Sequence, residues 1–126
     1  MCIRDRLTTT FAPRLLASRG AKVVVNDLGI GSGARGSAYG DAAAVAAEIV
    51  AAGGEAIADR HDVADEAGAR AIIQTAIDAW GRVDIVVNNA GSGVRASFEE
   101  MSTRDIERLV QVHLMGGVWM LSLIHI

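Results

Sequence analysis

Polar residues follow each of three apolar stretches of the sequence, and their types suit hydrogen bonding to hydroxyl and amino groups. Carboxylates accept hydrogen bonds, and a side-chain amide both accepts and donates them. If the three stretches are parallel strands, their carboxyl ends share the edge of the sheet where open α/β proteins bind ligands. The polar residues that follow the three stretches are Asp27, Asp62 and Asn89.

The segments between these residues alternate between strand and helix. Residues 21–27 are a continuous β-branched run, which is typical of a strand buried on both faces. Residues 55–60 and 83–91 predict two further strands, and residues 41–54, 65–81 and 102–120 predict helices. This alternation predicts right-handed crossovers and a parallel sheet, the α/β doubly wound Rossmann fold, with strands two to four of its layout present.

Residues 31–36, GSGARG, match G-x-G-x-x-G, the pattern of a loop that binds a dinucleotide pyrophosphate. Such a loop begins at the strand end and finishes inside the first helical turn, whereas residues 28–30 and 37–40 intervene here. A carboxylate at Asp27 would also repel pyrophosphate. An acidic residue that closes the second strand instead binds ribose hydroxyls. We therefore interpret residues 21–27 as strand two, with the phosphate loop upstream, where residues 7–16 contain no glycine.

The two ends of the chain are related at the codon level. Residues 1–6, MCIRDR, can be encoded by a string whose reverse complement encodes residues 121–126, LSLIHI. Such a pair is typical of adapter sequence read in frame, so we expect both hexapeptides to be adapter-derived. Residues 7–120 are then a partial dinucleotide-binding domain that lacks strand one and the C-terminal half, and we expect this segment alone to be inactive.

Composition argues against several classes of partner. The formal net charge is −3 and no basic block occurs, which disfavours nucleic acid and anionic membrane surfaces. The single cysteine lies within residues 1–6, so neither a disulfide nor a thiolate metal site is expected. No apolar run reaches about 18 residues. These features predict a cytoplasmic protein.

Residues 12–120 resemble the short-chain dehydrogenase/reductase family, and NNAG after VDIVV carries the resemblance most specifically. The resemblance implies that Asp27 binds the adenosine ribose, that Asp62 and Val63 meet the adenine, and that Asn89, Ala90 and Gly91 line the adenosine side. It implies an oxidoreductase that acts on a secondary alcohol or ketone and forms a homo-oligomer through the helix from Thr103. NAD is favoured over NADP because Asp27 would repel the 2′-phosphate.

VVVNDLG and VHLMG look most like the (3R)-hydroxyacyl-CoA dehydrogenase branch, which implies an acyl-CoA substrate. His113 stands where many family members have an asparagine of a proton relay, a departure that this branch shares. The family's catalytic Tyr-x-x-x-Lys cannot form from the single tyrosine, Tyr39, and the single lysine, Lys22. No catalytic residue is therefore assigned.

Each candidate residue also has a purely structural interpretation. Asp27 and NNAG can be turn formers, Asp62 can help cap the following helix, and His113 can be a packing residue. A metal at Asp59, His61 and Asp62 is disfavoured because adjacent strand residues point to opposite faces. The alternative function is a non-catalytic dinucleotide-binding or redox-sensing module. A flavodoxin- or receiver-like domain would not explain NNAG.

Overall fold

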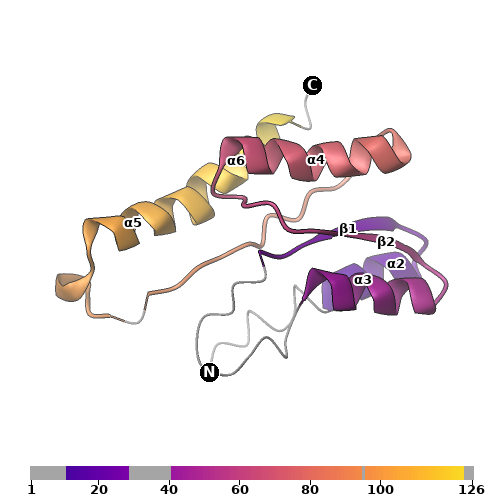
Figure 1. Cartoon of the computed structure of the whole chain (residues 1–126), viewed down its shortest axis with the longest axis horizontal. Coiled ribbons are helices and arrows are strands. Elements are labelled where there is room, and N and C mark those ends of the chain that lie inside the picture. The colour runs from indigo at the N-terminus through magenta and orange to yellow at the C-terminus, as the bar shows by residue number, and fades with distance from the viewer. Residues whose placement is uncertain (1–10, 29–40, 95, 124–126) are drawn as a thin grey trace. The chain divides into compact units, whose positions relative to one another are not determined.

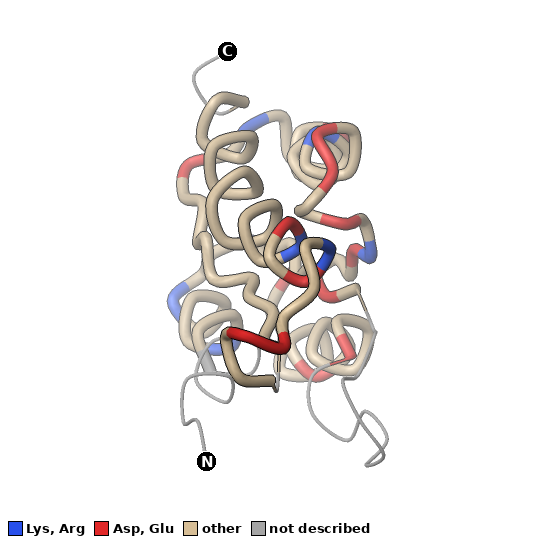
Figure 2. The backbone as a smooth tube through the Cα atoms, turned by 90° about the vertical axis from the view of Figure 1, so that its left-hand side faces the viewer, with Lys and Arg blue, Asp and Glu red and all other residues tan. Residues whose placement is uncertain are grey.

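The computed structural model describes residues 11–28, 41–94 and 96–123, which form two parts, one ending at His61 and one beginning at Asp62 (Figure 1). The GSGARG stretch and Tyr39 lie outside the described residues. Acidic and basic residues are interspersed along the described backbone (Figure 2). Among the described residues, no helix is long and apolar enough to cross a bilayer.

The first part contains two parallel strands, β1 (Lys22–Asn26) and β2 (Glu55–Asp59), paired from Lys22 opposite Glu55 to Asn26 opposite Asp59. Helix α3 (Ala42–Ala51) makes the crossover that a parallel pair requires. Helices α2 (Phe11–Ser18) and α3 lie on the same side of the strands in Figure 1 and contact each other. The predicted parallel pairing of these two strands is confirmed.

Local sequence signals set the ends of these helices. Asp41 caps α3 by accepting a hydrogen bond from the Ala43 N–H at 3.2 Å. Gly20 and Gly53 follow α2 and α3 with φ of 84° and 86°, left-handed values that disfavour a side chain. These ends are set locally, because capping depends on residues within one turn of the helix end.

The core of the first part forms where α3 packs on the strands. Ala42, Val45 and Ile49 recur at helical spacing on one face of α3, and they cluster with Val25 of β1. Val25, Val45 and Ile49 are only 2–3% exposed. Burying each such side chain contributes roughly 1.5–3 kcal/mol, so this face holds the helix to the sheet.

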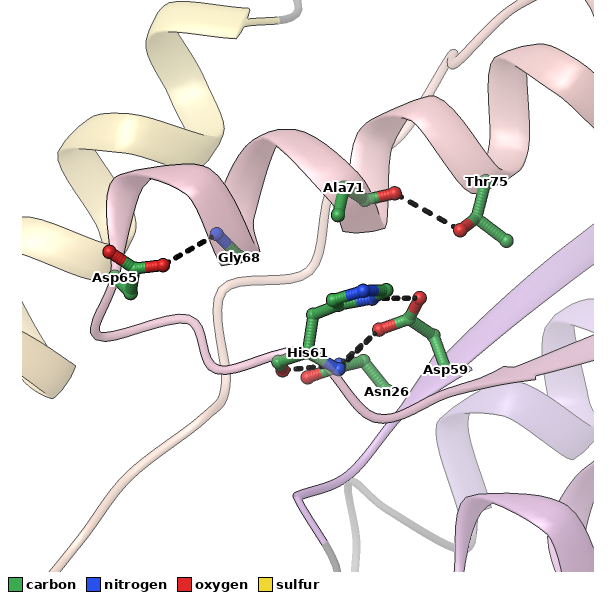
Figure 3. Close-up of polar contacts among 7 residues, drawn as sticks. All are labelled: Asn26, Asp59, His61, Asp65, Gly68, Ala71 and Thr75. Atoms are coloured by element: carbon green, nitrogen blue, oxygen red, sulfur yellow. Dashed lines mark hydrogen bonds and ion pairs between the residues drawn. The ribbon is translucent and has the colours of Figure 1, made fainter.

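The second part is helical. Helix α4 (Glu66–Trp80) begins after Asp65, which accepts a hydrogen bond from the Gly68 N–H at 3.0 Å (Figure 3). It ends before Gly81, whose φ is 76°. The short 3₁₀ turn η1 (Phe98–Glu100) precedes α5 (Thr103–Val110), the π-helical segment η2 (Gln111–Met115) and α6 (Gly116–Leu123). Helices α4 and α6 pack together within this part.

The predicted strand over residues 83–91 is wrong for this structure, because residues 82–94 form no strand. Ile85 and Val87, expected in a buried strand, are 69% and 57% exposed. In a sheet of order 3-2-1-4-5-6, the fourth strand pairs with the first and fifth, and the described residues include no candidate for either. A strand forms through hydrogen bonds to a neighbour, so the apolar run alone cannot make one.

The predicted long helix over residues 102–120 is present, but it is not uniform. Ser102 and Asp105 form a capping box at its start, with the Asp105 nitrogen 3.2 Å from the Ser102 Oγ. The π-helical segment that follows centres on His113. Such single-turn insertions are frequent at functional sites because they rotate the residues after them around the helix axis.

Candidate functional site

Asp27 is the first residue after β1 and is half-buried. Its backbone N–H donates to the Asp59 carbonyl at 3.1 Å, which continues the pairing of β1 with β2 by one residue. The residue therefore lies at the carboxyl edge of the parallel pair, as the sequence predicts. This edge is where parallel α/β sheets bind ligands.

Three side chains join the carboxyl ends of β1 and β2 and form what we name the Asn26–Asp59–His61 cluster (Figure 3). Nδ2 of Asn26 donates to Oδ1 of Asp59 at 2.8 Å and to the His61 carbonyl at 2.9 Å. The His61 backbone N–H donates to the same Oδ1 at 2.9 Å, and its ring Nδ1 lies 2.9 Å from Oδ2. The cluster fixes the end of the strand that carries Asp27.

Asp59 is the buried polar residue of this cluster, with 5% of its surface exposed. Burial by itself would raise the pKa of its carboxyl group. Hydrogen bonds from the side chain and backbone of His61 and from Asn26 outweigh burial and hold the pKa below its ordinary value. Asp59 is therefore a carboxylate at neutral pH, with its charge stabilised by donors.

The sequence by itself gives only a weak sign of this cluster. Asn26 and Asp59 each end an apolar run, but the strand register decides whether they face each other. Asp59 and His61 hydrogen-bond directly, whereas Asp62 has different partners. Among the described residues, no group of three His, Cys, Asp or Glu side chains is arranged to hold a metal ion.

In the second part, Asp62 opens the turn that leads into α4. Its Oδ1 accepts a hydrogen bond from the Ala64 N–H at 2.9 Å, and its carbonyl accepts from the Asp65 N–H at 3.3 Å. The N-cap of α4 is Asp65, and Asp62 orders the turn that leads into that cap.

Arg108 of α5 binds the same carboxylate through both terminal nitrogens. Nη1 lies 2.8 Å from Oδ2, and Nη2 lies 3.3 Å from Oδ1. Partial burial would raise the pKa of Asp62, but the hydrogen bonds and charge of Arg108, with the Ala64 N–H, lower it below its ordinary value. Asp62 is thus a charged and oriented acceptor.

Two glycines contact the backbone of Asp62 and Val63 from different helices. A Cβ at Gly68 would lie 2.2 Å from the Asp62 carbonyl oxygen, and a Cβ at Gly116 would lie 2.9 Å from the Val63 carbonyl oxygen. Both distances are shorter than a carbon and an oxygen can approach without strain. The absent side chains therefore let α4 and α6 pack directly on the turn.

The NNAG residues lie within the extended stretch 82–94, where Asn88, Asn89, Ala90 and Gly91 are all exposed. His113 contacts the end of this motif. Its Nε2 lies 3.1 Å from the Ser92 N and 2.8 Å from the Ser92 carbonyl oxygen, and a Cβ at Gly91 would lie 3.0 Å from its Cε1. The structure therefore brings His113 together with Gly91, a contact that sequence spacing does not reveal.

The described residues include hydrogen-bond acceptors in each part, and they do not assemble a proton-transfer group of the tyrosine–lysine kind. Asp27 and Asp62 are acceptors for hydroxyl or amino groups, and the exposed backbone of Ala90 and Gly91 offers further polar contacts. Nζ of Lys22 lies 3.1 Å from Oε2 of Glu55 in an exposed ion pair. Acceptors of this kind suit the adenosine half of a dinucleotide, which donates from ribose hydroxyls and from the adenine amino group.

Comparisons with known proteins identify similar sequences and structures. The family described as short chain dehydrogenase matches residues 10–125. The chain is 50% identical over 101 residues to the peroxisomal hydratase-dehydrogenase-epimerase of Saccharomyces cerevisiae, an alignment that covers 80% of this chain and 11% of that protein.

Two solved structures are similar as well. The crystal structure of a short chain dehydrogenase from Mycobacterium avium is 40% identical with a TM-score of 0.75, covering 87% of this chain and 38% of that one. A metagenomic short-chain oxidoreductase in complex with NADP is 32% identical with a TM-score of 0.71, covering 87% of this chain and 46% of that one. The chain thus spans less than half the length of each of these three proteins.

Proposed function

Because the chain belongs to the short-chain dehydrogenase family, we propose that it supplies the adenosine-binding part of an oxidoreductase that uses a nicotinamide cofactor. The predicted family and the predicted α/β class are confirmed by the family match and by the solved relatives. The observation that best supports the adenosine role is Asp62, a charged carboxylate whose orientation is fixed by Arg108 and by its own turn.

The roles proposed for the individual residues follow from their chemistry. Asp27 accepts hydrogen bonds from the ribose hydroxyls, and Asp62 and Val63 contact the adenine. The backbone from Asn89 to Gly91 lines the adenosine side, where the absence of a Cβ at Gly91 permits close approach. When bound, the nicotinamide would take up a hydride from a secondary alcohol or supply one to a ketone.

We propose NAD rather than NADP as the cofactor. NADP carries a phosphate on the ribose hydroxyl that Asp27 is proposed to bind, and two negative charges at close range repel each other. In the full-length protein, we expect Asp27→Ser to raise kcat/KM with NADP relative to kcat/KM with NAD by about tenfold or more. Asp78→Ser, at an exposed position of α4, should leave this ratio unchanged. Unchanged selectivity in the Asp27 variant would overturn the choice of NAD.

For the substrate we propose a 3-hydroxyacyl thioester, such as a hydroxyacyl-CoA. The support is the likeness of VVVNDLG and VHLMG to that branch, together with a relative named hydratase-dehydrogenase-epimerase. Fold alone adds nothing to this choice, since one fold carries many functions. A substrate screen of the full-length protein tests it, and activity on sugars or steroids without activity on acyl-CoA compounds would contradict it.

The segment by itself is proposed to be inactive, because its single tyrosine and single lysine cannot form Tyr-x-x-x-Lys. The alternative remains a non-catalytic dinucleotide-binding module. Hydride transfer by the full-length protein would favour the enzyme over the non-catalytic module. Changing the tyrosine of a Tyr-x-x-x-Lys motif to phenylalanine should then abolish turnover and leave NAD binding intact. NAD binding without any turnover of alcohols or ketones would favour the module.

The full-length protein is also proposed to form a homo-oligomer through α5 and α6. Ile106 and Val110 on α5 are 40% and 46% exposed, and Val118 on α6 is 49% exposed. Gly116 packs against Val63 inside the chain, whereas a Cβ added at Gly117 would meet no heavy atom within 4 Å. Gly117 is therefore the glycine left for a close approach by a partner helix.

A further inference from the structure

The contact between Arg108 and Asp62 joins two residues that lie 46 positions apart in the sequence. Both terminal guanidinium nitrogens, Nη1 and Nη2, bind the carboxylate, so the planar fork of the arginine sets the plane of the carboxylate. The side chains are 41% and 33% exposed, respectively, so a ligand can still reach the pair.

The hydrogen bonds of Asp62 leave it with limited acceptor capacity. A carboxylate offers about four acceptor positions, two on each oxygen. Oδ1 accepts from the Ala64 N–H and from Nη2 of Arg108, and Oδ2 accepts from Nη1. These contacts leave one acceptor position, on Oδ2, which suits a single N–H donor.

Two helices pack closely on the backbone that carries this carboxylate. Gly68 packs against the Asp62 backbone, and Gly116 packs against the Val63 carbonyl. With the backbone held from α4 and α6, the direction of the remaining acceptor position depends on the side-chain torsions of Asp62. Arg108 and Ala64 are the partners that fix those torsions.

We propose that Arg108 is a positioning residue that makes the site select adenine over 6-oxo purines. The inference rests on the proposed function, in which Asp62 meets the adenine. Adenine presents a 6-amino donor, which fits the remaining position on Oδ2. A 6-oxo purine presents a carbonyl oxygen there, and two acceptors facing each other repel. Without Arg108 only the Ala64 N–H holds the carboxylate, so Oδ2 is no longer directed at the 6-amino group and the discrimination between the two bases falls.

The chemistry of arginine makes this role specific. Lysine carries the same charge on a single nitrogen and lacks the two parallel N–H donors that fix the plane of a carboxylate. Arg108→Lys therefore keeps the local charge but loses the fork. Arg104 lies one turn earlier on α5 and is exposed, so Arg104→Met is a matched control for loss of a positive charge from this helix.

The experiment measures dissociation constants of the full-length protein for NAD and for nicotinamide hypoxanthine dinucleotide, in which a 6-oxo group replaces the 6-amino group. The unchanged protein should bind NAD about tenfold more tightly, the value of one hydrogen bond to a charged group. Arg108→Met should bring this ratio close to one, chiefly by weakening NAD. Arg108→Lys should give an intermediate ratio, and Arg104→Met should leave the ratio unchanged.

Four outcomes differ from this expectation. If Arg108→Met weakens both dinucleotides equally and keeps the ratio, Arg108 acts only on stability and the proposal is overturned. A wild-type ratio of one also overturns it, because the base is then not selected at all. If neither dinucleotide binds the unchanged protein, the proposed function itself fails. If Arg108→Met does not fold, the ratio of the two dissociation constants in Arg108→Lys is the test. A ratio equal to that of the unchanged protein would then refute the positioning role of Arg108.

Discussion

Replacing Gly68 by alanine tests whether the turn at Asp62 is as tightly packed as the structure indicates. Gly68 is buried in the first turn of α4. An added Cβ would lie 2.2 Å from the Asp62 carbonyl oxygen, 3.0 Å from its carbonyl carbon and 3.1 Å from its nitrogen. All three are backbone atoms, so no side-chain rotation can relieve the contact. Either the start of α4 or the turn must move.

The size of the effect follows from two opposing contributions. Alanine stabilises a helix interior by about 1 kcal/mol relative to glycine. Forcing a methyl group into a packed site costs about 1–3 kcal/mol. A Cβ only 2.2 Å from an oxygen, against a contact distance above about 3.3 Å, places this site at the upper end of that range. We expect Gly68→Ala to lower the free energy of unfolding by roughly 1–2 kcal/mol.

Gly93→Ala is the control, because no heavy atom lies within 4 Å of a Cβ at Gly93 and its φ is not positive. This variant should be stabilised by about 0.5–1 kcal/mol. Urea unfolding followed by circular dichroism measures both changes, and hydrogen exchange of the amides in residues 62–72 locates the effect. Equal shifts of the same sign in the two variants would refute the packing argument, as would a Gly68 variant as stable as the unchanged protein.

Further predictions concern charge, capping and association. The lowered pKa of Asp59 means that its contribution to stability is complete above about pH 3.8 and is lost as pH falls through its folded-state value. As pH is lowered, the urea midpoint should therefore fall less steeply in Asp59→Asn than in the unchanged protein. An equally steep fall in both would contradict the stabilising role of the Asn26–Asp59–His61 cluster. Asp65→Ala should lower the free energy of unfolding by about 1 kcal/mol. Asp78→Ala removes only the hydrogen bond from Gln74 Nε2 at 2.7 Å, so it should change the free energy of unfolding by less than about 0.5 kcal/mol. Val110→Glu should shift the full-length protein toward monomer in light scattering, and an unchanged mass would exclude this face as the interface.

Much of this protein follows from local sequence. Asp41 and Asp65 start helices, and Gly20, Gly53 and Gly81 end them, because capping and left-handed backbone conformations depend on a few neighbouring residues. The strands over residues 21–27 and 55–60 were identifiable for a similar reason, since their apolar runs flank a helix of the right length for a parallel crossover.

Pairing between distant segments follows from the tertiary structure alone. Residues 83–91 have the composition of a buried strand and yet form none, because a strand requires a neighbour to complete its hydrogen bonds. The Asn26–Asp59–His61 cluster depends on the register of β1 with β2, and the fork of Arg108 on Asp62 depends on how α5 packs. The sequence by itself determined the helix ends and the candidate site residues. Only the tertiary structure decided which side chains hold those residues in place, because such contacts depend on the spatial approach of segments far apart in the chain.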